Sequence, residues 1–278
     1  MNNGAPQLSL GIIGLGRMTE AIVQGVIAAG TMRPTDILAT RRNTDELRRQ
    51  AAELGIRTTP DNNVVAQECS VVLLGVKPYQ LLDVTSALTA LAPETILISV
   101  AAGIPTTAIE EAVEGEIPVV RAMPNTPALV GAGVTAICGG RYAKAEHLEV
   151  ASQLLGATGT CLTVEEEWMD AITAISGSGP AYYFRFTEAL AQAAISIGLD
   201  PELAQQLACE TFVGAARLLE ESGRSPEELR RQVTSPGGTT EAALGSFDEN
   251  DLSGLVEKAV ARALARGVEI GQQAAETE

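Results

Sequence analysis

Two glycines near the N-terminus, Gly14 and Gly16, have the spacing of a backbone turn that can hold a phosphate group. They follow an apolar run at residues 8–13 and precede a helical pattern over residues 19–29. A strand that enters a helix through such a turn lets the backbone approach a pyrophosphate, and the helix start adds free N–H groups. The full pattern Gly-x-Gly-x-x-Gly would have a glycine at Thr19. The match is incomplete, so a ligand-free strand–helix turn stays open as an alternative.

The second candidate is a pair of arginines, Arg41 and Arg42, that follows the strand pattern of residues 35–40. In a dinucleotide-binding unit an acid at this place takes the ribose 2′-hydroxyl of NAD, whereas an arginine accommodates the 2′-phosphate of NADP. The chain has Thr40 and the two arginines here and no acid. The planar guanidinium suits a phosphate because it donates two parallel hydrogen bonds. The residues therefore favour NADP, and the solvated start of a helix from Asn43 is the alternative.

The third candidate is the run Ser-Pro-Gly-Gly-Thr-Thr at residues 235–240, which precedes a helical pattern. Two glycines and two hydroxyls at a helix N-terminus can form a compact anion site of backbone N–H groups and side-chain donors. An ordinary N-capped turn would need only one serine or threonine. The excess of such residues favours an anion-binding role.

These residues need a sheet to position them, and the first half of the chain has the pattern for one. Apolar runs at 71–76, 96–100 and 117–122 alternate with helical stretches such as 106–113. Near-continuous apolar runs are typical of parallel strands that are covered on both faces. Two later runs, at 134–138 and 160–164, complete a predicted doubly wound parallel α/β sheet. Ligands of such sheets lie outside the carboxyl ends of the strands.

The second half has helical periodicity and no further strand candidate, so we expect domains at 1–164 and 165–278. The run Ser-Gly-Ser-Gly-Pro at 176–180 interrupts the helical pattern, either as a plain kink or as a close backbone approach to a ligand. The next helix, 181–197, is apolar on more than one face. Because such a surface must be buried, we expect a homodimer through this domain.

Charge and cysteine usage restrict the class of partner. The 278 residues carry a formal net charge of -16, which argues against nucleic acid or an anionic membrane surface. The four cysteines have no Cys-x-x-Cys pairing, so neither a zinc site nor a disulfide framework is expected. Residues 1–7 include no basic residue and no apolar run has membrane-spanning length, so we expect neither a leader segment nor a membrane span. We therefore expect a cytoplasmic protein that binds a small molecule, with no metal.

Four motifs together resemble those of pyrroline-5-carboxylate reductases. They are residues 76–78 (Val-Lys-Pro), 119–127 (Val-Val-Arg-Ala-Met-Pro-Asn-Thr-Pro), 176–182 (Ser-Gly-Ser-Gly-Pro-Ala-Tyr) and 233–240 (Val-Thr-Ser-Pro-Gly-Gly-Thr-Thr). The resemblance extends over about residues 8–271 in the same order. It implies an N-terminal Rossmann-type domain and an all-helical C-terminal dimerisation domain with swapped packing, often in larger rings of dimers. It also implies reduction of 1-pyrroline-5-carboxylate by NADPH or NADH, the last step of proline synthesis.

The same resemblance assigns roles to individual residues. Thr239, Thr240 and the amide of Gly238 would hold the substrate carboxylate, and the Thr240 hydroxyl would lie near the ring nitrogen. Glu166 matches a position that approaches the site in some relatives, and it completes the set expected to act on the substrate. The cofactor would contact Ile13, Gly14, Leu15, Gly16, Arg17, Met18, Thr40, Arg41, Asn62, Gly75, Val76, Lys77, Pro78, Val100, Ala101 and Ala102.

The chemistry of an imine agrees with these residue types. A protonated C=N bond accepts hydride readily, so the protein needs to supply positioning and electrostatics more than a strong acid. A β-hydroxyacid dehydrogenase would need a catalytic lysine on its long helix, and no lysine lies between Lys144 and Lys258. A non-catalytic protein that senses NADPH stays open, although it would not need the anion site at residues 235–240.

Overall fold

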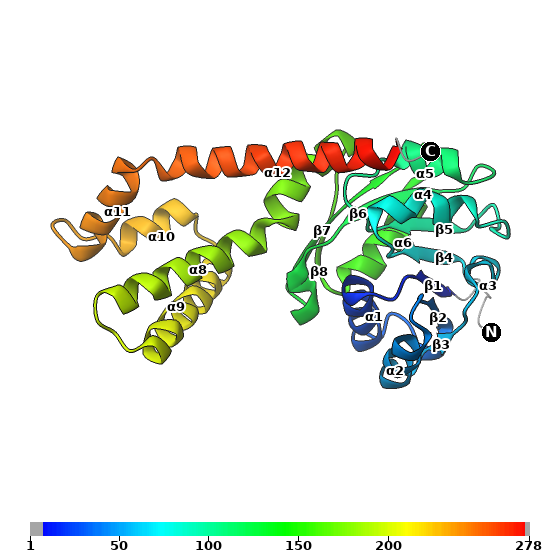
Figure 1. Ribbon diagram of the computed structural model, residues 1–278, viewed down its shortest axis with the longest axis horizontal. Coiled ribbons are helices and arrows are strands. Elements are labelled where there is room, and N and C mark those ends of the chain that lie inside the picture. Colours follow the sequence, from blue (N-terminus) through cyan, green and yellow to red (C-terminus); the bar gives the residue numbers. More distant parts are fainter. Residues whose placement is uncertain (1–7, 276–278) are drawn as a thin grey trace. The chain divides into compact units, whose positions relative to one another are not determined.

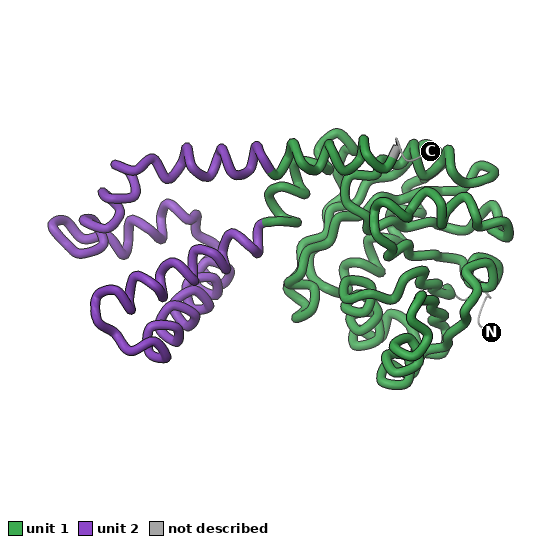
Figure 2. The backbone as a smooth tube through the Cα atoms, viewed as in Figure 1, with its two compact units in different colours: residues 1–178, 263–278 green, residues 179–262 purple. Residues whose placement is uncertain are grey.

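The computed structural model describes residues 8–275, which form two compact units. The first unit combines the chain up to residue 178 with the C-terminal residues from 263, and the second holds residues 179–262 (Figure 2). The domain boundary after residue 164 stays a prediction.

The first unit is built on a sheet whose eight strands, within the described residues, have the order β3-β2-β1-β4-β5-β6-β7-β8 (Figure 1). Pairing is parallel from β3 to β6 and again between β7 and β8. The strands are β1 (Leu10–Ile13), β2 (Ile37–Thr40), β3 (Arg57–Thr58), β4 (Val71–Leu74), β5 (Ile96–Ser99), β6 (Val119–Met123), β7 (Gly133–Gly139) and β8 (Gly159–Thr163).

The direction of β7 differs from the expectation of a wholly parallel sheet. β7 pairs with β6 in antiparallel fashion, with Arg121 opposite Cys138. The two strands are joined by the short 3-10 turn η2 (Thr126–Val130), which ends at Gly131 with φ 72°. A parallel neighbour would need a crossover of a dozen residues or more, so this short connection returns the chain in the opposite direction. The doubly wound sheet is otherwise as predicted.

Helices cover both faces of the sheet, and each face has its own apolar core (Figure 1). Every residue of β1, β2, β4 and β5 is buried, as expected of strands covered on both sides. One core includes residues of α1 (Arg17–Ala28), α2 (Thr44–Leu54) and α6 (Ala145–Gly156). The other includes residues of α3 (Asn62–Glu68), α4 (Pro78–Ser86) and α5 (Thr106–Ala112).

The last turns of α12 (Leu252–Ala275) belong to the first unit and lie against the loop that follows β5. Gly103 has φ 81°, and a Cβ added there would lie 2.8 Å from the Gly267 carbonyl oxygen and 3.0 Å from the Gly271 nitrogen. Glycine at 103 therefore lets the helix backbone approach this loop closely.

The second half is helical, as its periodicity predicts, and its local signals match its helix ends. Asp200 caps α9 (Pro201–Ser222) by accepting from the amides of Glu202 and Leu203. Ser225 and Glu228 form the capping box of α10 (Pro226–Gln232). The interruption near residue 176 is a π-helical segment, η4 (Thr173–Gly177), directly before α8 (Gly179–Ser196). The remaining elements are η3 (Glu166–Trp168), α7 (Met169–Ile172) and α11 (Thr239–Glu249).

Large apolar side chains of α8 and α9 are exposed in the single chain. Tyr183, Phe184 and Phe186 have exposed fractions of 62%, 57% and 50%, and Leu218 has 53%. Their exposure is what the predicted homodimer would remove. Among the described helices, none combines the length and the apolar character needed to cross a membrane.

Candidate active site

A pocket of about 600 Å³ lies where β1, β2 and β4 end, at the carboxyl edge of the parallel sheet. This is the edge at which doubly wound sheets bind ligands, and the volume is within the usual range for small-molecule sites. The pocket brings together most of the predicted cofactor residues. Its lining is Ile13, Gly14, Leu15, Gly16, Thr40, Arg41, Arg42, Asn43, Pro60, Asn62, Gly75, Val76, Lys77, Gln80, Asp83 and Val84.

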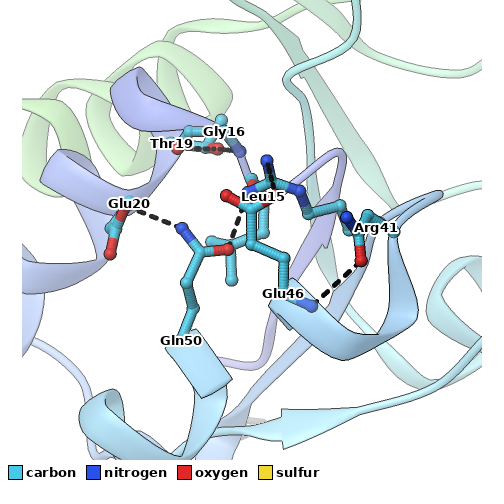
Figure 3. Close-up of polar contacts among 8 residues, drawn as sticks. Leu15, Gly16, Thr19, Glu20, Arg41, Glu46 and Gln50 are labelled. Carbon is cyan, nitrogen blue, oxygen red and sulfur yellow. Dashed lines mark hydrogen bonds and ion pairs between the residues drawn. The ribbon is translucent and has the colours of Figure 1, made fainter. Parts of the chain in front are cut away.

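The glycine turn between β1 and α1 uses its own amides internally. The amides of Gly14 and Leu15 donate to the carbonyl of Thr40 at 3.1 and 3.0 Å, so the end of β2 fixes the turn. The Gly16 amide donates to the Thr19 hydroxyl at 2.8 Å (Figure 3). The first helical amides, at Arg17 and Met18, have no acceptor within α1. They are the donors that the turn leaves for an anion.

Thr19, at the place of the third motif glycine, is accommodated by a glycine on another strand. Its side chain is 1% exposed, and its hydroxyl also donates to the Gly14 carbonyl at 2.9 Å. A Cβ added at Gly75, just after β4, would lie only 2.3 Å from the Thr19 methyl. The close packing of helix and strand that a third glycine would give is therefore retained, because Gly75 leaves space for the threonine methyl.

Gly16 is the residue of the turn that leaves space for a ligand. A Cβ built on it meets no atom within 4 Å, although the residue lines the pocket. Backbone without a side chain at a pocket wall suits the close approach of a pyrophosphate, and α1 begins directly after it. The residues present therefore fit a dinucleotide.

The end of β2 carries the polar groups predicted to bind the adenosine half of the cofactor. The Thr40 hydroxyl donates to the side-chain oxygen Oδ1 of Asn62 at 2.7 Å, which leaves the side-chain nitrogen Nδ2 of Asn62 as a donor at the pocket. Arg41 points toward the glycine turn, where it donates to the Leu15 carbonyl (Figure 3). Arg42 is exposed and lines the same pocket.

Several predicted cofactor residues lie outside this lining. Arg17 and Met18 occupy the start of α1, and Pro78 begins α4. Val100, Ala101 and Ala102 follow β5, one strand beyond β4. Sequence reasoning missed Gln80 and Asp83, which line the pocket from α4. Neither residue has a local sequence signal, because each is an ordinary polar residue of an amphipathic helix.

Lys77 is exposed, so it lacks the buried surroundings expected of a catalytic general acid. It precedes α4 in an extended conformation, and its carbonyl accepts from the amide of Gln80 at 2.9 Å. Pro78 then begins the helix, a position where a missing N–H costs nothing. These contacts agree with the loop-shaping interpretation of the Lys-Pro pair.

The second unit contains the run at 235–240, and its geometry explains both glycines. Gly237 has φ 70°, and a Cβ at Gly238 would lie 2.5 Å from the Ser235 hydroxyl oxygen. The turn closes through the bond from the Gly238 amide to the Ser235 carbonyl, and α11 begins at Thr239. Within the described chain the hydroxyls of Thr239 and Thr240 make no hydrogen bond, and the first amides of α11 have no acceptor inside the helix. The turn thus offers several unpaired donors together.

Glu166 is held by contacts within the first unit. One carboxylate oxygen accepts from the Thr106 amide at 2.7 Å, and the other accepts from the Thr106 hydroxyl at 2.6 Å. Nη1 of the buried Arg121 lies 3.5 Å from the first oxygen, and Arg121 Nη2 pairs with Asp170 at 2.5 Å. Glu166 therefore caps the start of α5, and its assignment to the substrate stays a prediction.

The single histidine and the buried cysteines, the remaining candidates for acid–base or nucleophilic chemistry, contact only the protein itself in the described chain. His147 accepts from the amide of Lys144 through Nδ1 at 3.0 Å, at the start of α6. Burial raises the pKa of Cys69 to about 11 and that of Cys138 to about 12, so neither is a thiolate nucleophile near neutral pH. No cluster of His, Cys, Asp and Glu in the described part of the chain has the geometry of a metal site.

Comparisons with known proteins cover both units. Residues 166–270 match a family model described as pyrroline-5-carboxylate reductase dimerisation, and residues 9–103 match one described as NADP oxidoreductase, coenzyme F420-dependent. A pyrroline-5-carboxylate reductase of Corynebacterium melassecola is 41% identical over 268 residues, which cover 95% of this chain and 99% of the relative. That of Pseudomonas aeruginosa is 40% identical over 266 residues, or 95% and 97% of the two chains.

Solved structures give the same result. The structure of a pyrroline-5-carboxylate reductase from Coxiella burnetii has a TM-score of 0.88 and 38% identity, and the match covers 95% of this chain and 98% of that one. The Plasmodium falciparum pyrroline carboxylate reductase with NADP bound has a TM-score of 0.84 and 28% identity, with 96% and 100% coverage.

Proposed function

We infer the function of this chain from one premise: it belongs to the pyrroline-5-carboxylate reductase family. It is an NAD(P)H-dependent oxidoreductase that reduces the C=N bond of 1-pyrroline-5-carboxylate to give L-proline, the last step of proline biosynthesis. The observation that carries the substrate assignment is the start of α11, where unpaired hydroxyls and amides gather in one turn.

The substrate carboxylate binds at this turn in our proposal. The hydroxyls of Thr239 and Thr240 are short-range donors, and the helix dipole adds a partial positive charge. The Gly238 amide, which donates to the Ser235 carbonyl in this structure, would turn from that bond to the carboxylate. The chain as a whole is acidic, so local donors of this kind are needed to hold an anion. Support comes from the two glycines, which hold the backbone in a conformation that side chains would obstruct.

The Thr240 hydroxyl acts at the ring nitrogen. When bound, the reduced nicotinamide supplies the hydride that adds to the carbon of the C=N bond. The Thr240 hydroxyl forms a hydrogen bond at the nitrogen, and the proton that the product amine keeps comes either from this hydroxyl, which solvent then reprotonates, or directly from solvent. A hydroxyl suffices here because the imine nitrogen is itself basic, so orientation and electrostatics supply most of the acceleration.

The cofactor occupies the pocket at the ends of β1, β2 and β4. We propose that the backbone amides of Arg17 and Met18 bind the pyrophosphate and that the side-chain amide of Asn62 binds the ribose. Gly75, Val76 and Lys77 line the pocket beyond the glycine turn. Pro78 and, further along the sheet, Val100 to Ala102 would contact the cofactor outside that lining. The arginines after β2 favour NADPH, with NADH as a possible second donor.

The protein is an oligomer through its helical region. Support comes from the match of residues 166–270 to a dimerisation model and from the exposed aromatic side chains of α8. We propose in addition that the dimer has swapped helical packing and that dimers assemble further. We also place the protein in the cytoplasm, because its four cysteines are free thiols, as is usual in a reducing compartment.

The test of the function is a spectroscopic assay. NADPH absorbance is followed before and after 1-pyrroline-5-carboxylate is added to the purified protein, with product proline measured in the same samples. We expect oxidation of NADPH only when the imine is present, in equal amounts with proline. A protein that binds NADPH but shows no imine-dependent oxidation would be a sensor and would exclude the proposed reaction.

A further inference from the structure

We propose that the two adjacent arginines after β2 have different tasks. Arg41 is a positioning residue that holds the glycine turn for NADPH and NADH alike, whereas Arg42 alone distinguishes NADPH through its 2′-phosphate. This inference rests on the proposed function of the pocket as a nucleotide site. The position of the two arginines would suggest that both bind the 2′-phosphate, whereas this inference assigns that task to Arg42 alone.

The contacts of Arg41 are all directed into the protein (Figure 3). Its Nη1 donates to the Leu15 carbonyl and to the Gln50 side-chain oxygen, both at 2.7 Å. Its Nη2 forms an ion pair with Glu46 at 2.6 Å. The guanidinium thus joins the glycine turn to α2, the helix that carries Glu46 and Gln50.

These contacts fix the turn at the residue between its two glycines. The amide of Leu15 donates to the Thr40 carbonyl, and its own carbonyl accepts from Arg41, the residue after Thr40. The Leu15 side chain is fully buried, at 0% exposure. The backbone N–H and C=O of Leu15 are therefore both fixed by residues at the end of β2. Leu15 lies close in the chain to Arg17 and Met18, whose amides would contact the pyrophosphate. The conformation of this turn matters equally to both nucleotides, because they share the pyrophosphate.

Moving the Arg41 guanidinium to a bound phosphate would leave several groups without a partner. Gln50 is 4% exposed, its oxygen accepts from Arg41, and its nitrogen donates to Glu20 of α1 at 2.8 Å. Glu46 would face the phosphate dianion without its cation. Unpaired buried polar groups and like charges both oppose such a move. The structure therefore favours an Arg41 that keeps its contacts when a nucleotide binds.

Arg42 has the opposite character. It is exposed, lines the pocket and makes no hydrogen bond or ion pair with the part of the chain that the structure describes. It precedes Asn43, which caps α2 by accepting from the Glu46 amide at 3.1 Å. An uncommitted guanidinium at the pocket can bind a phosphate in bidentate fashion without breaking any contact.

The experiment measures nucleotide binding by itself, with no imine present. Dissociation constants of NADPH and NADH are determined by nucleotide fluorescence for the full-length wild type, R41A, R42A and the control R49A. Arg49 lies on α2 and pairs only with Glu53 in the described chain, so R49A should change neither constant. R41A should raise both constants by about tenfold, the loss expected for charge-assisted hydrogen bonds, with their ratio kept. R42A should raise the NADPH constant by about tenfold and leave that of NADH unchanged.

Further variants guard against a protein that is merely misfolded. R41K keeps the charge but cannot bridge Leu15, Gln50 and Glu46 together, so both constants should rise equally and by less than in R41A. E46Q removes the paired charge while leaving the other two contacts of Arg41, so the NADPH/NADH ratio should stay as in the wild type. General destabilisation would lower the melting temperature without this pattern of binding ratios.

The outcomes that overturn the proposal are equally defined. If R41A or R41K weakens NADPH selectively, or if E46Q strengthens NADPH alone, Arg41 moves to the phosphate. Unchanged binding in R41A, or equal losses for both nucleotides in R42A, would also overturn it. A wild type that binds nucleotides but never oxidises NADPH with the imine would reject the proposed function and leave the division between the arginines intact.

Discussion

The substitution Gly75→Ala tests the packing that lets a threonine stand at the third glycine place of the motif. The added Cβ would lie 2.3 Å from the Thr19 methyl and 2.6 Å from the Gly14 carbonyl oxygen. Both distances are far below ordinary contact, and overpacking of this kind costs about 1–3 kcal/mol. Because the carbonyl belongs to the turn, which cannot move as freely as a side chain, we expect a loss of about 3 kcal/mol.

A double-mutant cycle separates the two clashes. Thr19→Ser removes the methyl but keeps the hydroxyl that bonds Gly16 and Gly14, and it should cost about 1 kcal/mol by itself. In the double variant the methyl no longer obstructs the alanine. We therefore expect the double variant to be about 1 kcal/mol more stable than the sum of the single changes predicts. It should stay less stable than the wild type, because the Gly14 carbonyl still obstructs the Cβ.

Unfolding in urea at one protein concentration measures these free energies, provided that the denaturant slope stays constant. Gly16→Ala is the matched control in the same turn, since its Cβ would meet no atom within 4 Å. It should change stability by less than about 0.5 kcal/mol but raise the dissociation constants of both nucleotides, because the methyl enters the proposed pyrophosphate site. Additive losses for Gly75→Ala and Thr19→Ser would refute the packing argument.

Three further outcomes are expected. Thr240→Ala should lower kcat/KM for the imine by about tenfold or more, since a donor to a reacting site is worth ~1.5–4 kcal/mol, and an unchanged value in steady-state assays would refute its role. Glu166→Gln should lower the free energy of unfolding by about 1–3 kcal/mol, because it weakens the cap on Thr106 and the pairing with Arg121; a large loss of kcat/KM at unchanged stability would instead place Glu166 in the chemistry. Burial raises the pKa of the Cys69 thiol from 9.0 to about 11 and that of the Cys138 thiol to about 12. Because these thiols ionise in the unfolded chain before they ionise in the folded one, the stability linked to them is complete below pH 9 and is lost as the pH rises toward the folded-state pKa values. Melting temperatures should therefore fall above about pH 9, and less steeply in a variant with alanine at both positions.

Much of the fold follows from local signals in the sequence. The apolar runs predict the buried strands β1, β4 and β5, and the capping box at Ser225 and the stop at Gly223 predict ends of helices in the second half. Such features depend on residues close together in the chain, so their patterns are readable without a structure. The direction of β7 depends instead on the length of the preceding connection and on which strand edge is free.

The candidate site shows the same distinction. The glycine turn and the run at 235–240 are recognisable because each uses residues that are adjacent in the chain. The contacts of Arg41 and Glu166 are not, since each acts on residues brought close only by folding: Leu15 for the arginine and Thr106 for the glutamate. A charged residue has no sequence signal that tells whether it faces a ligand or a backbone carbonyl.

The amino-acid sequence by itself determined the doubly wound sheet with its helical second half, the family of the chain and the two turns proposed to bind anions. Periodicity and adjacent motifs carry this information, because hydrogen bonding within a turn or helix is local. Only the tertiary structure decided that Gly75 leaves the space that Thr19 fills, and that Arg41 is committed to the glycine turn while Arg42 is free for a ligand. These contacts join residues that are far apart in the sequence, so they exist only when the whole unit has folded and packed closely.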